Sequence, residues 1–211
     1  SVYQKIYLGD IAARHSVDNT FALRVLFKKL AESVKQPMSF TRVANIVSST
    51  GVKVGKTTII NYIEYAKDTW LISSIQNIAG KLVDKETNPK YYFTDNGILN
   101  LFLLDGETSL LENLVAINLL RKYGRNDAVF FYNQAVEVDF YIPDEAVAIQ
   151  VCYNLDNSDG TFDREISALL KLSNVLECKK LMVITRDSEQ VLEIDHKVIE
   201  IIPVWKWLLN L

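Results

Sequence analysis

Two short apolar segments carry the side chains whose types and spacing could do chemistry. Glu137 and Asp139 alternate in the first segment, EVDFYI, and Gln150 and Cys152 alternate in the second, VAIQVC. Because successive side chains of a strand point to opposite faces, each pair is expected on one face of its strand. In metal-dependent phosphodiester hydrolysis, carboxylates hold Mg²⁺ and a lysine steadies charge. Such an enzyme would have Glu and Lys at positions 150 and 152, so this chain lacks two charges of that chemistry.

A third acidic residue, Glu112, completes the candidate cluster. It lies in a predicted helix, and Glu112, Asp139 and Gln150 form the candidate catalytic set, with Glu112 and Asp139 as candidate metal ligands. The amide of Gln150 offers a hard cation a carbonyl oxygen but no charge. Cys152 cannot act as an ammonium group, and no histidine in the segment would activate its thiol. We therefore expect an inactive cluster and a small core residue at Cys152, although the carboxylates equally suit a solvated strand face.

Composition narrows the class of protein. The 211 residues, 49% of them hydrophobic, suit one large domain or two small ones. No apolar run reaches the roughly 18 residues of a membrane-spanning helix, and no signal-peptide pattern is visible, so we expect no membrane partner and a cytoplasmic location. Two cysteines and two histidines favour neither a disulfide framework nor a structural zinc site. We expect no cofactor in this chain, except Mg²⁺ if it hydrolyses phosphodiesters.

The charge is distributed unevenly along the chain. Residues 1–95 contain 13 Lys and Arg against 8 Asp and Glu, whereas residues 96–211 contain 10 against 18. The first part is therefore suited to contact phosphates, and the second would be repelled by them unless metal ions intervene. An excess of five positive charges over 95 residues is also common on solvated surfaces.

The first part has the order of elements found in a winged helix-turn-helix. Helical spacing of apolar residues covers 19–34, Ser39 is a plausible N-cap for a short helix over 40–48, and a third helix is expected over 57–67. Two strands follow, in TWLISSIQNI and KYYFTD. The N-terminus of the third helix would enter the major groove of double-stranded DNA. The expected DNA contacts are Lys53, Lys56, Thr57, Thr58 and Asn61. A helix-turn-helix used only for packing or protein contacts remains the alternative, which the acidic Glu64 and Asp68 favour.

The segment GVKVGKTT resembles a phosphate-binding Walker A loop only superficially. Three residues separate Gly51 from Gly55, where that loop needs four so that successive backbone N–H groups wrap the phosphates. The preceding residues also indicate a short helix and a turn instead of a strand. We expect this segment to form the turn and the start of the third helix.

The second part has the pattern of an α/β layer domain. A helix over 109–123 precedes three strands, then a polar loop over 154–163, a helix over 164–175 and two more strands. Turn signals at Asn96-Gly97 and Asp105-Gly106 mark the border. We therefore predict an α+β chain of two domains: residues 1–95, a winged helix-turn-helix with an N-terminal linker, and residues 96–211, an α/β domain.

Three motifs in series, PKYYFTDNGI at 89–98, LENLVA at 111–116 and EVDF at 137–140, resemble a large family of prokaryotic AAA+-like ATPases. The resemblance covers the C-terminal region of that family: a winged helix followed by a restriction-endonuclease-like, PD-(D/E)xK-like domain of unknown function 4143. Family members typically have IEVK where this chain has IQVC at 149–152. The resemblance implies that the chain is the non-ATPase portion of a longer ATPase, with ATP bound only by a domain absent here.

Two classes of function follow. The first is a binding module for double-stranded DNA or for a protein, in which the nuclease-like domain is inactive and the fragment has no catalytic activity of its own. Its expected partners are DNA, the ATPase domain of the same polypeptide and a second copy of the chain. The alternative is a metal-dependent phosphodiesterase or nuclease with an altered active site, which uses Glu112, Asp139 and Glu137.

Overall fold

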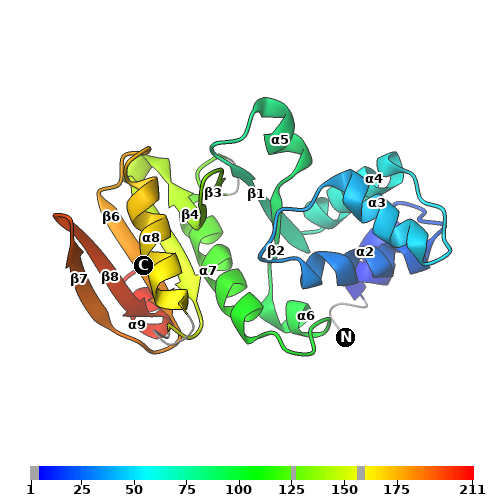
Figure 1. Cartoon of the computed structure of the whole chain (residues 1–211). Coiled ribbons are helices and arrows are strands. Elements are labelled where there is room, and N and C mark those ends of the chain that lie inside the picture. Colours follow the sequence, from blue (N-terminus) through cyan, green and yellow to red (C-terminus); the bar gives the residue numbers. More distant parts are fainter. Residues whose placement is uncertain (1–4, 125–126, 156–159) are drawn as a thin grey trace. The chain divides into compact units, whose positions relative to one another are not determined.

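The computed structural model describes residues 5–124, 127–155 and 160–211, and the chain divides into two compact units (Figure 1). The first unit comprises the residues up to 74 together with 86–106, and the second comprises 75–85 and 107–211. The predicted domains, 1–95 and 96–211, stay a prediction, because this division reflects the compactness of the fold and not independent folding. Residues 156–159 of the predicted polar loop lie outside the described residues.

The first unit is built mainly of helices. They are a π-helix η1 (Lys5–Ala13), α2 (Thr20–Glu32), α3 (Phe40–Ser49), α4 (Lys56–Asp68) and α6 (Asn96–Asn100), accompanied by strand β2 (Lys90–Phe93). Side chains cap two of these helices as expected for their residue types: Asn19 accepts from the Ala22 N–H at 2.9 Å, and Ser39 accepts from the Arg42 N–H at 3.2 Å. The predicted helices over 19–34, 40–48 and 57–67 are confirmed to within two residues at each end.

The hydrophobic core of this unit is formed by the apolar face of each helix. The core residues recur at helical spacing, so that each helix turns one stripe inward. They include Leu23, Leu26, Phe27, Leu30, Val43, Val47, Ile59 and Ile63, each at most 1% exposed. Between the two predicted strands TWLISSIQNI and KYYFTD, the polar sequence favours a loop, but the structure has a short helix there, α5 (Leu82–Thr87). Its six residues are too few to show a helical period.

Within the described residues the strands form one mixed sheet of eight, in the order β2-β1-β3-β4-β5-β6-β8-β7. Strand β1 (Ile72–Asn77) begins in the first unit and ends in the second, where Gln76 pairs with Phe130 in parallel. The other strands are β3 (Phe130–Asn133), β4 (Glu137–Ile142), β5 (Val147–Cys152), β6 (Lys180–Thr185), β7 (Gln190–Ile194) and β8 (Lys197–Pro203). The chain therefore has an α+β fold, with N-terminal helices followed by a mixed sheet with interspersed helices.

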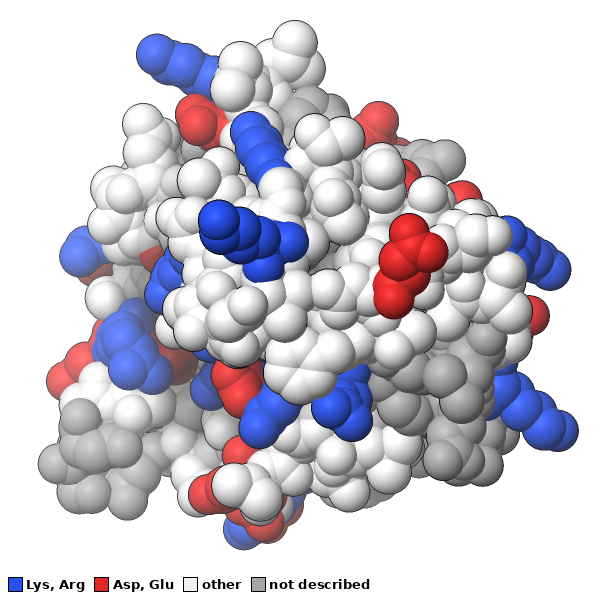
Figure 2. Space-filling view, turned by 90° about the vertical axis from the view of Figure 1, so that its right-hand side faces the viewer, with Lys and Arg blue, Asp and Glu red and all other residues white. Residues whose placement is uncertain are grey.

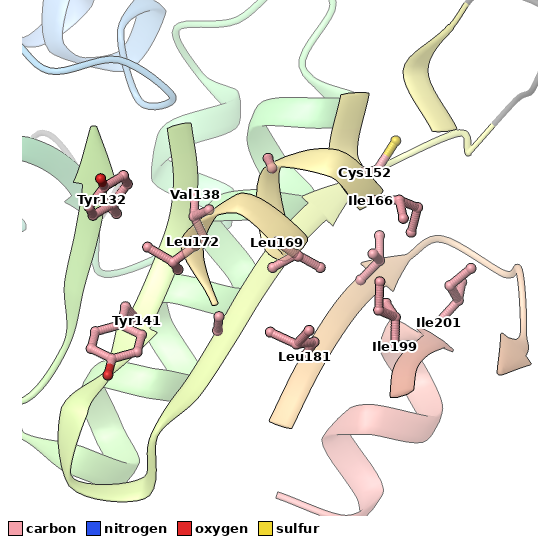
Figure 3. Close-up of a cluster of buried hydrophobic side chains, with 13 residues drawn as sticks. Tyr132, Val138, Tyr141, Cys152, Ile166, Leu169, Leu172, Leu181, Ile199 and Ile201 are labelled. Carbon is pink, nitrogen blue, oxygen red and sulfur yellow. The ribbon is translucent and has the colours of Figure 1, made fainter. Parts of the chain in front are cut away.

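Helices cover the sheet of the second unit. These are α7 (Glu107–Tyr123), which packs against β5, α8 (Thr161–Leu172), which packs against β4, β5 and β6, and α9 (Val204–Leu209), which packs against β6 and β8. A 3₁₀ turn, η2 (Pro143–Glu145), joins β4 to β5. Figure 3 shows the main core of the unit, where Ile166, Leu169 and Leu172 of α8 lie over Leu181 and Ile199 of the strands.

The two strands expected after α8, in KKLMVIT and KVIEIIPVW, form β6 and β8, whereas β7 was not predicted from the sequence. The first residue of β6 is exposed and the rest are buried, because parallel neighbours lie on both sides and helices cover its faces. Strand β7 lies at the edge of the sheet with Val191 68% exposed, so its sequence lacks a clear buried face. None of the helices among the described residues is long and apolar enough to cross a membrane.

Candidate functional site

The candidate cluster of the second unit lies where β4 and β5 separate. The antiparallel pairs end at Phe140 and Ile149, and the next two residues in register are Asp139 and Gln150. Beyond this point, hydrogen bonds from the side chains of Asp139 and Gln150 replace the backbone hydrogen bonds between the two strands. The Asp139 N–H donates to Gln150 Oε1 at 2.9 Å, and the Val151 N–H donates to Asp139 Oδ2 at 2.9 Å. The sheet is therefore held together at this point by the very side chains predicted to do chemistry.

Gln150 is the centre of this network. It is 4% exposed, and its Nε2 donates both to the Glu137 backbone carbonyl at 3.1 Å and to Glu165 Oε2 at 2.7 Å. With Oε1 accepting from the Asp139 N–H, both amide protons and the amide oxygen are used. Only one orientation of the amide satisfies these partners, so the donor and acceptor ends of Gln150 are fixed by the network.

Glu165 joins the cluster from α8, and the sequence prediction missed it. Glu165 is 8% exposed. Its Oε1 accepts two hydrogen bonds from the Arg164 guanidinium, one from Nε at 3.1 Å and one from Nη2 at 2.7 Å. Burial raises the pKa of the Glu165 carboxyl, and the nearby carboxylates of Asp139 and Glu137 raise it further, whereas Arg164 lowers it. Its position beside Ile166 on the buried stripe of α8 was the available signal, since a charged residue in such a stripe needs a partner.

The other predicted residues are distributed as follows. Glu112 is 3% exposed and lies on α7, which packs against β5, whereas the hydrogen-bonded set comes from β4, β5 and α8. Cys152 is 6% exposed in the core cluster, as Figure 3 shows, and its thiol donates to the Asn154 carbonyl oxygen at 3.1 Å. Among the described residues, no group of three or more His, Cys, Asp and Glu is placed to hold a metal ion.

The predicted DNA contacts lie at the start of α4 in the first unit. Lys53, Lys56, Thr57 and Asn61 are exposed, and Thr58 is half-buried. Gly55 is the N-cap and supplies no side-chain hydrogen bond, so the first backbone N–H groups of α4 are not covered by a capping side chain. Neither Lys53 nor Lys56 makes an ion pair within the described part of the chain.

The surface around these residues is only sparsely charged. Figure 2 shows the face of the helical unit, on which Lys and Arg stand as separate points among uncharged side chains, with Asp and Glu scattered between them. On the same helix Glu64 pairs with Lys67 at 3.1 Å and neutralises that lysine. On α4, the lysine that lies outside this ion pair is Lys56, at the N-terminus of the helix.

A cavity of about 330 Å³ adjoins the same helix. Lys53, Thr58 and Asn61, three of the predicted DNA contacts, line it together with Tyr62 and Tyr65 of α4. The segment His15–Asn19 between η1 and α2 lines it as well. The His15 ring stacks on Tyr65, with 3.7 Å between ring centroids and 6° between planes. Sequence reasoning gave no sign of this cavity, because its residues come from separate segments.

The chain matches a protein family whose function is not known. A family model described as Domain of unknown function (DUF8612) matches residues 1–111. The chain belongs to the DUF8612 family. The match extends over the whole first unit and ends within α7, just before Glu112. The candidate cluster of β4, β5 and α8 therefore lies outside the part of the chain that the DUF8612 model matches.

Two curated relatives extend over nearly the whole DUF8612 chain. The uncharacterized protein MJ1544 of Methanocaldococcus jannaschii is 32% identical over 97% of this chain and 48% of its own length. An uncharacterized protein of Haemophilus influenzae is 29% identical over 99% of this chain and 51% of its own length. The chain thus spans about half the length of these relatives. No solved structure matches it.

Proposed function

We propose that this chain is a DNA-binding module of a longer protein, in which a winged helix-turn-helix reads double-stranded DNA and a nuclease-like domain has lost hydrolytic activity. The three helices α2, α3 and α4 followed by β1 and β2 have the order of a winged helix. The helix, three strands, helix and strand from α7 to β6 have the order of a restriction-endonuclease-like domain. The resemblance to AAA+-like ATPases supports both assignments.

The observation that carries DNA binding is the exposed N-terminus of α4. Its uncovered N–H groups bear a partial positive charge, and Lys53 and Lys56 add two cations that make no ion pair within the described residues. Phosphate groups of a DNA backbone are suited to both features. Thr57 and Asn61 are exposed on the same helix and can hydrogen-bond base edges.

The hydrogen bonds of Gln150 support the loss of hydrolysis. A metal-binding carboxylate at this position would offer free lone pairs, whereas Gln150 is committed to Asp139, Glu137 and Glu165. An oxygen of Asp139 is likewise bonded to a backbone N–H of β5. The residues that would hold Mg²⁺ in an active nuclease here join two separating strands, and the domain serves as a scaffold.

The length of the relatives supports a larger parent protein. MJ1544 and the Haemophilus protein are each about twice as long as the segment that matches this chain. The resemblance to AAA+-like ATPases assigns an ATP-binding domain to the remainder, so the ATPase domain of the same polypeptide is the first protein partner. A second copy of the chain is a further partner in this proposal.

DNA binding is tested by fluorescence anisotropy of a labelled duplex at several salt concentrations. We expect binding at low salt, a linear fall of log affinity with log salt, and a slope reduced by about one for Lys56→Ala. Lys28→Ala, at an exposed site of α2, removes the same charge and should keep the wild-type slope. Absence of binding at low salt, or equal slopes for the two variants, would falsify the proposal.

Hydrolysis is the competing function, and Glu165 is the observation in its favour, since it adds a carboxylate beside Asp139. Its two oxygens are nevertheless engaged by Gln150 and Arg164. Calorimetric titration with Mn²⁺ and cleavage assays on a plasmid decide between the two functions. Metal-dependent cleavage that is lost in Asp139→Asn would establish the nuclease instead of the scaffold.

A further inference from the structure

The cavity beside α4 gathers polar side chains that the fold leaves unused. Asp18, Lys53, Thr58 and Asn61 all line it, and within the described residues none of these side chains makes a hydrogen bond or an ion pair. The Nε2 atom of His15 is buried and also lacks a hydrogen-bond partner there. Asp18, Lys53 and Asn61 are exposed, so water can be displaced from them, and ligand sites are hollows with a few convergent polar groups. The cavity therefore has the composition of a binding site.

Two features of the lining indicate the chemistry of a ligand. The stacked rings of His15 and Tyr65, with Tyr62 at 6.4 Å from Tyr65, provide flat apolar surface of the kind on which a planar ring packs. Lys53 provides a cation without an ion-pair partner in the described part of the chain, and such a cation favours an anionic group. A volume of about 330 Å³ suits a small molecule of that kind.

We propose that this cavity binds a small molecule that joins a planar ring to an anionic group. The ring packs against the aromatic lining that His15 and Tyr65 provide, and the anionic group meets Lys53. Asn61 and Thr58 supply further hydrogen bonds, and Asp18 accepts from any hydroxyl or amino group of the ligand. Two sources share this chemistry, an aromatic carboxylate and a nucleoside monophosphate, and the experiment separates them.

The two histidines of the chain make the test direct, because His15 lines the cavity and His196 is exposed in the turn between β7 and β8 of the other unit. The imidazole signals are followed by NMR at constant pH, and His196→Asn identifies which signal belongs to His15. The probes are nicotinate with its neutral analogue nicotinamide, and AMP with its neutral analogue adenosine. Inorganic phosphate alone serves as the control for the anionic group.

We expect one anionic probe to shift the His15 signals saturably below about 10 mM while those of His196 stay in place, with its neutral analogue binding roughly tenfold more weakly. Lys53→Gln should remove that difference, whereas Lys28→Gln should keep it. Saturation by nicotinate identifies a carboxylate site and saturation by AMP a nucleotide site. The proposal is overturned if neither anionic probe moves His15, if phosphate alone reproduces the shift, or if the neutral analogues bind equally well.

The same cavity has a consequence for DNA, which rests on the proposed function. Lys53, Thr58 and Asn61 would serve both the ligand and the DNA, so the two should compete. The anisotropy of a bound duplex should then fall when the ligand that shifts His15 is added. The NMR titration contains no DNA, so a failure of DNA binding leaves the outcome for the cavity unaffected.

Discussion

Gln150 decides what the sheet of the second unit can do. A glutamine is isosteric with the glutamate that nuclease chemistry would require, yet it donates two hydrogen bonds where a carboxylate donates none. Its two donors go to the Glu137 carbonyl and to Glu165. The amide of Gln150 therefore gives the buried Glu165 carboxylate a hydrogen-bond donor and links β4 to β5 where their backbones separate.

Replacing Gln150 by a glutamate should destabilise the folded protein. In Gln150→Glu the two donated bonds are lost and a negative charge faces Glu165, so we expect a loss of about 2–4 kcal/mol in the free energy of unfolding at neutral pH. The measurement is urea denaturation followed by circular dichroism. Gln190→Glu, at an exposed position of β7, is the matched control and should change stability by less than about 0.5 kcal/mol. A tolerated Gln150→Glu variant would mean that the network contributes little.

Glu165 should make stability depend on pH. Its folded-state pKa is raised, so the folded protein holds the proton more tightly than the unfolded chain does. The contribution of Glu165 to stability is therefore greatest below the ordinary pKa of 4.5 and falls as pH rises from there through the folded-state pKa. Glu165→Gln should flatten this fall in denaturation measured across pH, whereas Glu193→Gln at an exposed site should not. Identical pH profiles for Glu165→Gln and the wild type would contradict this.

At the scale of elements, α4 begins without a side-chain cap. Gly55 has φ −76° and ψ 157°, which any residue can adopt, and a Cβ placed there meets no atom within 4 Å. This absence matters because N-cap side chains normally stabilise a helix start. Gly55 instead leaves the N–H groups of α4 available to an external anion, and the lysines beside them remain unneutralised.

A capping residue at position 55 should raise the stability of the protein and lower its affinity for DNA. Gly55→Asp is expected to raise the free energy of unfolding by about 0.5 kcal/mol, since Asp caps the helix and complements its dipole. The same negative charge should lower duplex affinity several-fold, in the anisotropy assay of the proposed function. Gly51, with φ +89°, gives the contrast, because Gly51→Asp should destabilise through backbone strain. Equal effects of the two substitutions would refute this account of α4.

The elements were largely predictable because their signals are local. The apolar period of α2, the cap at Ser39 and the bounds of β4 are all readable from neighbouring residues, and the α+β class follows from them. What the sequence could not give depends on distant segments. Glu165 meets Gln150 only because α8 folds back over β5, and the cavity unites His15 with Lys53 across α2 and α3. Short or exposed elements such as α5 and β7 also lack a readable period.

At the scale of the whole molecule, we expect neither unit to be stabilised by divalent metal ions. Because no group of three or more His, Cys, Asp and Glu is placed for a metal in the described residues, we expect millimolar Mg²⁺ or Mn²⁺ to leave the melting temperature unchanged. Differential scanning fluorimetry with and without EDTA measures this. A rise in melting temperature that disappears in Asp139→Asn would place a cation at the cluster.

The course of β1 through both units bears on where the chain can be cut. A truncated protein that begins at residue 96 would lose β1, and the parallel partner of β3 at Gln76 and Phe130 would be missing. The exposed N–H and C=O groups of β3, with Phe130 and Phe131, would then offer a template for pairing with other chains. Light scattering should show concentration-dependent self-association for residues 96–211 and less for residues 70–211, which retain β1. A protein cut at the domain border predicted from the sequence is thus expected to aggregate.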